Sequence, residues 1–237
     1  TAATGAWFGK APVASCTANP ITHGALAFYS PPSREGTKGG AFFFNVADPT
    51  VWGTFQLEAV TFHEGVPGHH FQIALSQELP DLHPILAEYL VAAYDEGWGL
   101  YTERLADEMG LYSSELDRIG MLSADSMRAC RLVVDTGMHA LGWTRDQAIT
   151  YFLDHSPMTL GQVVGEIDRY IGNPGQACAY MLGRLTIVDI RSHAEARLGE
   201  RFDIRAFHDQ VLATGSIPLG SLRRVIETWI DEIALTD

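Results

Sequence analysis

The sequence predicts a mainly α-helical domain with one small antiparallel β element near its N-terminus. Apolar residues recur at helical spacing from about residue 54 almost to the C-terminus. Two short aromatic runs, 25–29 and 41–46, flank a stretch rich in proline and glycine, which is the pattern of a β-hairpin with a long loop. Hydrophobic residues make up 46% of the 237 residues, so the chain can bury a sizeable core. We expect residues 1–237 to form a single domain.

The composition argues against several classes of partner. The formal net charge of −13 disfavours nucleic acid and anionic membrane surfaces. No run of 18 apolar residues occurs, so a membrane span is not expected. Cys16, Cys130 and Cys178 are widely spaced and form no CxxC pair, which argues against a disulfide framework.

The N-terminal residues carry few structural signals. Residues 1–24 lack a clear periodicity and are expected to form an extended lead-in. The runs at 25–29 and 41–46 are then paired as the two strands of the hairpin, and we expect no other strand pair.

Helix signals follow one another through the remaining chain. Thr144 with Gln147, and Thr159 with Gln162, have the spacing of a capping box. Pro174 suits the first turn of a helix. The expected helices span residues 54–64, 82–93, 96–109, 145–154, 160–172, 174–198, 204–214 and 220–235, with a long helix that begins at Ser113 or Ser114 and reaches about Leu141.

A histidine-rich motif is the strongest functional signal. It reads His63-Glu64-Gly65-Val66-Pro67-Gly68-His69-His70. A His-Glu pair followed by another His is how a helix presents two zinc ligands and a general base, although surface or helix-capping histidines would give the same letters. The usual spacing between the ligands is four residues, whereas His69 lies six residues after His63. An uninterrupted helix would separate them by about 9 Å along its axis, so the chain must leave the helix at Pro67 and Gly68.

A zinc site needs a third protein ligand, and the segment 94–105 is the best source. Glu96 begins an otherwise aromatic and apolar helix, and Glu103 lies two turns later on nearly the same face. Asp95 competes with Glu96, or caps the helix. Both carboxylates would also complement the positive N-terminus of a helix without binding metal.

Polar residues interrupt a second apolar helix. Arg131, Asp135 and His139 are spaced i, i+4 and i+8 and share one face, and Arg128 precedes them by three residues. The pattern fits a structural salt bridge or a role beside a cleft. Arginine is the natural partner of a substrate carboxylate because its planar fork binds two oxygens.

Two tyrosines follow in the segment 166–180. Tyr170 lies near a helix end, while Gln176 and Tyr180 share a face of the next helix. A phenol hydroxyl can donate to an oxyanion that develops on a carbonyl group, although most tyrosines only pack.

These segments together resemble the bacterial family known as domain of unknown function 885. The matching stretches are 63–72, 96–105, 131–144 and 169–176, with a weaker match at 207–219. The resemblance covers about residues 25–235. Members of that family are generally much longer, so the resemblance implies that this chain is the C-terminal half and that an N-terminal helical portion is missing. It also implies a bacterial protein, of either the cytoplasm or the cell envelope.

That family is similar in turn to the gluzincin metallopeptidases, which implies a zincin-like multi-helix fold and one Zn²⁺ per chain. The resemblance makes His63, His69 and Glu96 the metal ligands, with His70 as the alternative second ligand. It makes Glu64 the general base. Arg169-Tyr170 resembles the Arg-Tyr pair that supplies an oxyanion-stabilising tyrosine, with His139 as a further catalytic candidate. The candidate substrate-binding residues are Arg128, Arg131, Arg169, Gln176 and Tyr180.

The expected function is zinc-dependent hydrolysis of a peptide or small amide substrate, in the manner of a carboxypeptidase or dipeptidase. Two alternatives stay open. The site could serve hydrolysis of a non-peptide amide or an elimination as a lyase. Or the chain could be a binding module with a degenerate, metal-free site.

Overall fold

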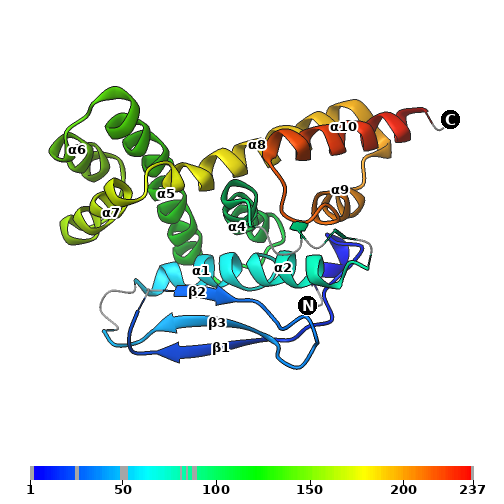
Figure 1. Ribbon diagram of the computed structural model, residues 1–237, viewed down its shortest axis with the longest axis horizontal. Coiled ribbons are helices and arrows are strands. Elements are labelled where there is room, and N and C mark those ends of the chain that lie inside the picture. Colours follow the sequence, from blue (N-terminus) through cyan, green and yellow to red (C-terminus); the bar gives the residue numbers. More distant parts are fainter. Residues whose placement is uncertain are drawn as a thin grey trace.

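The computed structural model describes residues 3–24, 27–48, 53–80, 82–83, 85–86 and 90–235. Helices dominate, and one three-stranded sheet near the N-terminus lies along α1 (Leu57–Glu64) and α2 (His69–Glu78), as Figure 1 shows. This arrangement confirms the predicted fold class, a mainly helical chain with a small β element.

The sheet contains the predicted hairpin and one strand more. Strands β2 (Ala27–Ser30) and β3 (Gly40–Asn45) pair in antiparallel fashion, as predicted. Strand β1 (Cys16–Ile21) pairs with β3 in parallel, so the strand order is β1-β3-β2. The expectation that residues 1–24 form only an extended lead-in was therefore wrong, since they also include a 3₁₀ turn at Ala3–Ala6. The strand β1 has little apolar alternation because it is mostly exposed.

The motif helix breaks where the sequence predicted. A 3₁₀ turn at Thr54–Gln56 leads into α1, which ends at Glu64, and α2 begins at His69. Four residues join the helices, and the Val66–Pro67 peptide bond is cis. A Cβ atom at Gly68 would lie 1.9 Å from the carbonyl oxygen of His63, so only glycine fits this turn.

Helix α4 (Ala92–Glu108) forms the centre of the molecule (Figure 1). It begins four residues before Glu96, and its N-cap is Val91, so neither Asp95 nor Glu96 starts or caps the helix as predicted. Of the helix expected at 82–93, residues 82–83 and 90–91 are not helical, and 84 and 87–89 lie outside the described residues. The side chains of Trp98 and Tyr94 are fully buried.

Helix α5 (Glu115–Leu141) and the two short helices after it follow the predicted caps. The Ser114 hydroxyl accepts from the Asp117 amide, and Gly142 is the C-cap residue that follows the end of α5 at Leu141. Helices α6 (Arg145–His155) and α7 (Leu160–Gly172) each begin with the predicted capping box. The main apolar core surrounds Trp98 and Tyr94. Helices α5, α6 and α7 enclose a second apolar cluster, which includes Phe152 and Ile167.

The C-terminal part of the chain is helical, and its first helix lies directly against α4. Helix α8 (Ala179–Leu198) packs against α4 and begins after a 3₁₀ turn at Gln176–Cys178, because Pro174 lies in a turn rather than in the helix predicted to start there. A 3₁₀ turn at Gly199–Arg201 leads to α9 (Ile204–Leu212) and then α10 (Leu219–Leu235).

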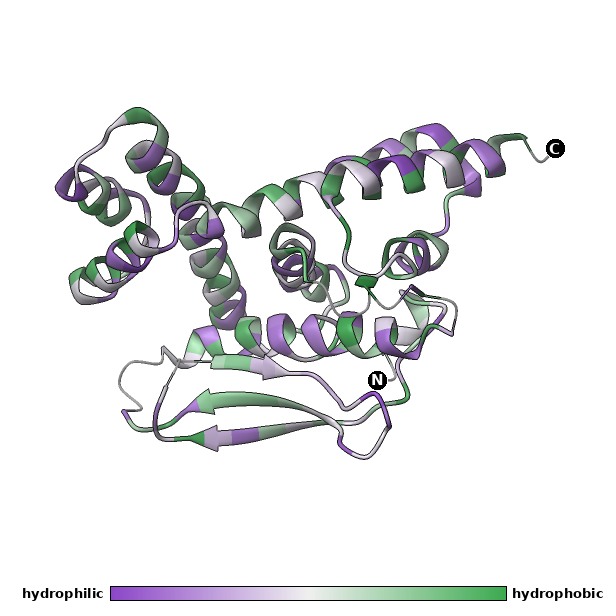
Figure 2. Ribbon diagram, in the orientation of Figure 1, coloured by the Kyte–Doolittle hydropathy of each residue, from purple (hydrophilic) through white to green (hydrophobic). Residues whose placement is uncertain are grey.

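The long helices carry both hydrophobic and hydrophilic residues along their length (Figure 2). This pattern is typical of helices with one face in a core and one in water. In the described ranges, none of the helices is both long enough and apolar enough to cross a membrane.

Candidate metal centre

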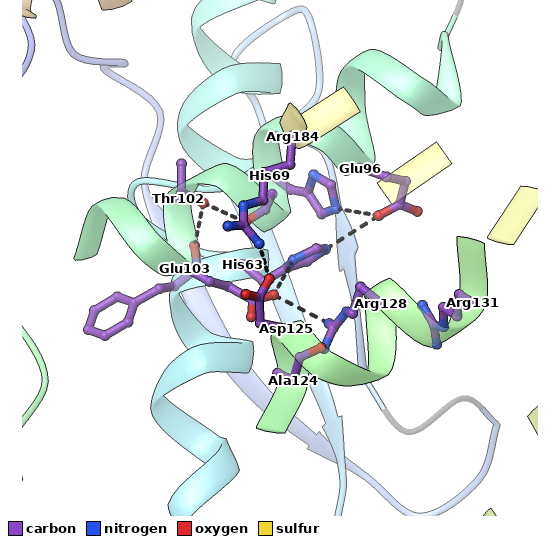
Figure 3. Close-up of polar contacts among 12 residues, drawn as sticks. His63, His69, Glu96, Thr102, Glu103, Ala124, Asp125, Arg128, Arg131 and Arg184 are labelled. Carbon is purple, nitrogen blue, oxygen red and sulfur yellow. Dashed lines mark hydrogen bonds and ion pairs between the residues drawn. The ribbon is translucent and has the colours of Figure 1, made fainter. Parts of the chain in front are cut away.

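Three side chains from three helices converge on one point. His63 lies in the last turn of α1, His69 begins α2, and Glu96 projects from the second turn of α4. The Glu96 Oε2 atom lies 3.4 Å from His63 Nε2 and 3.5 Å from His69 Nε2 (Figure 3). One ligand atom from each residue lies within 4.8 Å of the other two. These are the three residues that the sequence proposed as metal ligands.

The break between α1 and α2 makes this convergence possible. The rings of His63 and His69 lie at right angles, with centroids 4.7 Å apart. Helix α4 approaches closely because Gly99 has no side chain. A Cβ atom there would lie 2.7 Å from the nearest His63 ring atom.

The donor set fits a zinc ion. Two imidazole nitrogens and one carboxylate oxygen are zinc ligands, and three protein ligands leave a position open for water or substrate. The second nitrogen of His63 is also held as in zinc sites, since Nδ1 donates to Glu103 Oε1 at 2.8 Å. This contact fixes the ring so that Nε2 faces Glu96.

The surrounding charges favour a cation at this point. Burial lowers the pKa of His63, but Glu103 and Glu96 outweigh this effect and raise the pKa to about 9. Burial opposes ionisation of Glu96, yet the two histidines hold its pKa well below the usual value. The cluster therefore attracts either a proton or a metal ion.

The alternative ligands are occupied elsewhere. Both ring nitrogens of His70 have partners, because Nδ1 lies 2.8 Å from the Tyr29 hydroxyl and Nε2 lies 3.0 Å from the Ala14 carbonyl oxygen. His70 thus ties the sheet to α2 and is not directed at the cluster. Asp95 accepts from Gln72 and Ser216 on the buried side of α4.

A cavity of about 650 Å³ opens beside the cluster. Glu64, the predicted base, lines it together with His63, His69 and Glu96. Its size is in the range of small-molecule and substrate sites.

Of the three predicted arginines, Arg128 and Arg131 line this cavity, and they have different partners. Arg128 contacts Glu103 Oε1 through Nη2 at 3.3 Å and the Ala124 carbonyl oxygen through Nη1 at 3.2 Å. Arg131 instead donates to Glu166 at 2.7 Å and to the Tyr170 hydroxyl at 2.8 Å.

Glu166 lines the cavity and was given no role by the sequence. Burial raises the pKa of Glu166, but Arg131 and Arg169 outweigh this and lower it to about 2. The only sequence signal was its position one helical turn before Tyr170.

The two predicted tyrosines occupy different environments. Tyr170 is fully buried in the second apolar cluster, and its hydroxyl contacts Glu166 and Arg131. The described lining of the cavity includes Tyr180 and not Tyr170. The Tyr180 ring stacks over His63 with a centroid separation of 6.3 Å. Tyr180 is therefore the tyrosine whose ring lies beside the cluster, whereas the predicted oxyanion-stabilising residue Tyr170 lies in the core.

The remaining predicted residues, His139, Arg169 and Gln176, are not part of the described cavity lining. His139 contacts Asp135, which also accepts from the Gly175 amide, so Asp135 joins α5 to the turn before α8. The described cavity lining does not include His139, so its predicted catalytic role has no support from the position of its side chain. Arg169 donates to Gln176, and Gln176 donates to the Tyr180 hydroxyl at 3.4 Å. Arg169 and Gln176 thus support Tyr180 from behind, and the described lining includes neither of them.

Comparison with known proteins places the chain in a family of bacterial proteins. A profile of the family described as bacterial protein of unknown function (DUF885) matches residues 3–226. The chain therefore belongs to the DUF885 family, as its motifs indicated. None of the curated proteins matches it.

Two solved structures have a similar fold. A protein of Colwellia psychrerythraea matches 98% of this chain with 38% sequence identity and a TM-score of 0.93. A protein of Shewanella oneidensis matches 89% with 24% identity and a TM-score of 0.75, which shows the fold alone. Both are named "putative lipoprotein", the second with the addition "of unknown function". The chain spans 40% of the length of each.

Proposed function

We propose that this chain is a zinc-dependent hydrolase of peptide or related amide bonds, with the mode of action of a carboxypeptidase or dipeptidase. The observation that carries the proposal is the convergence of His63, His69 and Glu96 beside Glu64 in one large cavity. The same residues resemble the ligands and base of gluzincin peptidases, apart from the longer spacing between the two histidines, and this resemblance supports the class of reaction.

Each side chain has a role in the proposed reaction. His63, His69 and Glu96 would hold one zinc ion, and Glu103 keeps the His63 ring in place. When bound, zinc supplies a Lewis acid that polarises a carbonyl group and lowers the pKa of water. Glu64 takes a proton from the attacking water and passes it to the leaving amine.

Tyr180 is the proposed donor to the oxyanion. Burial raises the pKa of Tyr180, and Glu96 raises it further, so the phenol stays protonated at neutral pH. A protonated phenol that lines the cavity can donate a hydrogen bond to the developing negative charge. Arg131 stacks on its ring, with 4.7 Å between the guanidinium carbon and the centroid, and steadies the ring position.

The relatives suggest where this activity is located. Both solved relatives carry the name of lipoproteins, so we propose the bacterial cell envelope as the compartment. Fractionation of cells that express the full-length protein, followed by immunoblotting, tests this location. Recovery in the cytoplasmic fraction alone would refute it.

The decisive experiment replaces the proposed base. Glu64→Gln should bind one zinc per chain, as measured by elemental analysis, and should lose at least about 100-fold in turnover of a peptide panel. Glu58→Gln, the same exchange earlier in α1, is the matched control and should keep full activity. Unchanged turnover in Glu64→Gln would refute the base assignment. Absence of stoichiometric zinc in the wild-type protein would favour a metal-free binding module, and product masses separate amide hydrolysis from elimination.

A further inference from the structure

The cavity extends from the cluster of His63, His69 and Glu96 to residues of α5 and α7. Met127, Arg128 and Arg131 line it from α5, while Gly161 and Gly165 line it from α7. The Arg131–Glu166 ion pair joins the two helices beside these residues. The wall that α7 offers to the cavity is thus made partly of bare backbone.

Packing does not explain these two glycines. Among the described residues, a Cβ atom at Gly161 or Gly165 would meet no heavy atom within 4 Å. Glycine weakens a helix more than any residue except proline, so it is a costly choice inside α7. The two positions are one turn apart and share a face. Both glycines line the cavity, and a Cβ atom at either position would lie in open space, so the absence of side chains here keeps the cavity wide.

Arg128 supplies a second and independent indication of a ligand. Its side chain is nine-tenths buried and has five N–H donors. Two contacts go to Glu103 and to the Ala124 carbonyl, and Nε has no hydrogen-bond partner in the described part of the chain. Arg131 differs, since Glu166 and Tyr170 occupy its guanidinium. Nε is shielded from the cavity, but Arg128 lines the cavity, and the contacts of Nη1 and Nη2 use one N–H group of each, so the second N–H group of each is left for a ligand.

Arg128 is also close to the proposed reaction centre. Glu103 Oε1 contacts both His63 and Arg128, so a single carboxylate separates this guanidinium from a metal ligand. The guanidinium therefore lies close to the cluster, on the side of the His63 ring that carries Nδ1. Met127 is adjacent in sequence, and its flexible thioether adapts to apolar groups of different shape.

We infer that the preferred substrates are peptides and N-acylated amino acids that end in a large apolar residue, with the free C-terminal carboxylate bound by Arg128 and the side chain between Met127 and the glycine wall of α7. This inference rests on the proposed function, because it names the substrate class of the same site.

Hydrolysis of three matched probes tests the inference. The probes are benzyloxycarbonyl-glycyl-phenylalanine, its C-terminal amide, and benzyloxycarbonyl-glycyl-glycine. The zinc-loaded protein should cleave the phenylalanine acid with a kcat/KM at least about tenfold above that of either other probe, since a charge-assisted hydrogen bond is lost in the amide. Equal cleavage of the acid and the amide would overturn the role of Arg128.

Three variants separate the two parts of the subsite. Arg128→Gln should remove the preference for the acid over the amide, and Arg128→Lys should restore part of it. Gly165→Leu should remove the preference for phenylalanine over glycine by filling the cavity. Gly172→Leu is the matched control, because it is the same exchange at an open position at the end of α7, and it should retain both preferences. An unchanged preference in Gly165→Leu would overturn the role of the glycine wall.

A binding measurement that involves no hydrolysis tests the proposed subsite separately from the proposed hydrolase activity. N-acetylphenylalanine should bind to the wild-type protein and to Gly172→Leu in calorimetric titrations, and at least about tenfold more weakly to Arg128→Gln and Gly165→Leu. If no probe is hydrolysed but this binding pattern holds, the subsite stands and the hydrolase proposal falls. If the probes are hydrolysed but all four proteins bind N-acetylphenylalanine equally, the subsite falls alone.

Discussion

Glu103 provides the sharpest test of the metal centre, because it touches a proposed ligand without being one. Its Oε1 atom accepts from His63 Nδ1 at 2.8 Å, and its side chain is 1% exposed, so solvent hardly screens the interaction. Glu103→Gln keeps the shape and removes the charge. Loss of such an outer partner weakens metal binding by about 10- to 100-fold. Arg128 at 3.3 Å already offsets part of the charge, so we expect the lower end, about 10- to 30-fold or about 1.4–2 kcal/mol.

The measurement is the zinc dissociation constant, obtained by competition with a coloured zinc indicator after chelator treatment. Asp125→Asn is the matched control, because Asp125 is a partly buried carboxylate near Glu103 that pairs with Arg184 instead of a proposed ligand (Figure 3). It should leave zinc affinity within about threefold of the wild type. Wild-type affinity in Glu103→Gln, or equal losses in both variants, would refute the reasoning.

Three further predictions concern residues around the centre and the core. Tyr180→Phe should lower kcat by about 100-fold in steady-state kinetics, because the oxyanion loses its donor. Tyr170→Phe should leave kcat within a few-fold and lower the free energy of unfolding in urea by about 1.5–3 kcal/mol. The reverse pattern would return the oxyanion role to Tyr170. Burial lowers the pKa of His208 to about 4, so the unfolded chain gains a proton between pH 6.5 and 4 that the folded chain does not. This stabilisation is complete above pH 6.5 and is lost as the pH falls through 4. The free energy of unfolding should therefore drop by about 3 kcal/mol over that range, and an equally steep drop in His208→Gln would disprove the assignment. Gly99→Ala should weaken zinc binding and cost about 1–3 kcal/mol in thermal unfolding, because the new methyl group meets the His63 ring; unaltered zinc affinity would contradict this.

Features encoded by neighbouring residues could be predicted from the sequence. Ser114, Thr144 and Thr159 cap their helices as expected, because a cap depends on residues two or three positions apart. The departure from helix at Pro67 and Gly68 was predicted for a similar reason, since it followed from helix rise and local dihedral limits.

Features that depend on distant packing were missed. Strand β1 exists because β3 offers it an edge, and a parallel pairing leaves no hairpin signal in the sequence. His139 shares a helix face with Arg131, but eight residues of helix carry it about 12 Å along the axis and past the cavity. Tyr170 continues the apolar face of α7 with Ile167, so the core takes it, and only the packing of α8 brings Tyr180 to the cluster.

The geometry of the candidate centre depends more on α4 than on the histidine motif itself. A helix with ligands four residues apart fixes them by its own hydrogen bonds, but here the two histidines belong to separate helices. Residues 96–103 of α4 take the place of these hydrogen bonds in fixing the two histidines. Trp98 Nε1 donates to the Pro67 carbonyl at 3.0 Å and holds the turn between the helices, and Gly99 leaves room for the His63 ring. Glu96 and Glu103 lie on either side of these residues in the sequence. Glu96 contacts Nε2 of His63, and Glu103 contacts Nδ1. The longer spacing of the motif is therefore compatible with a single metal ion only because the sequence of α4 is matched to it.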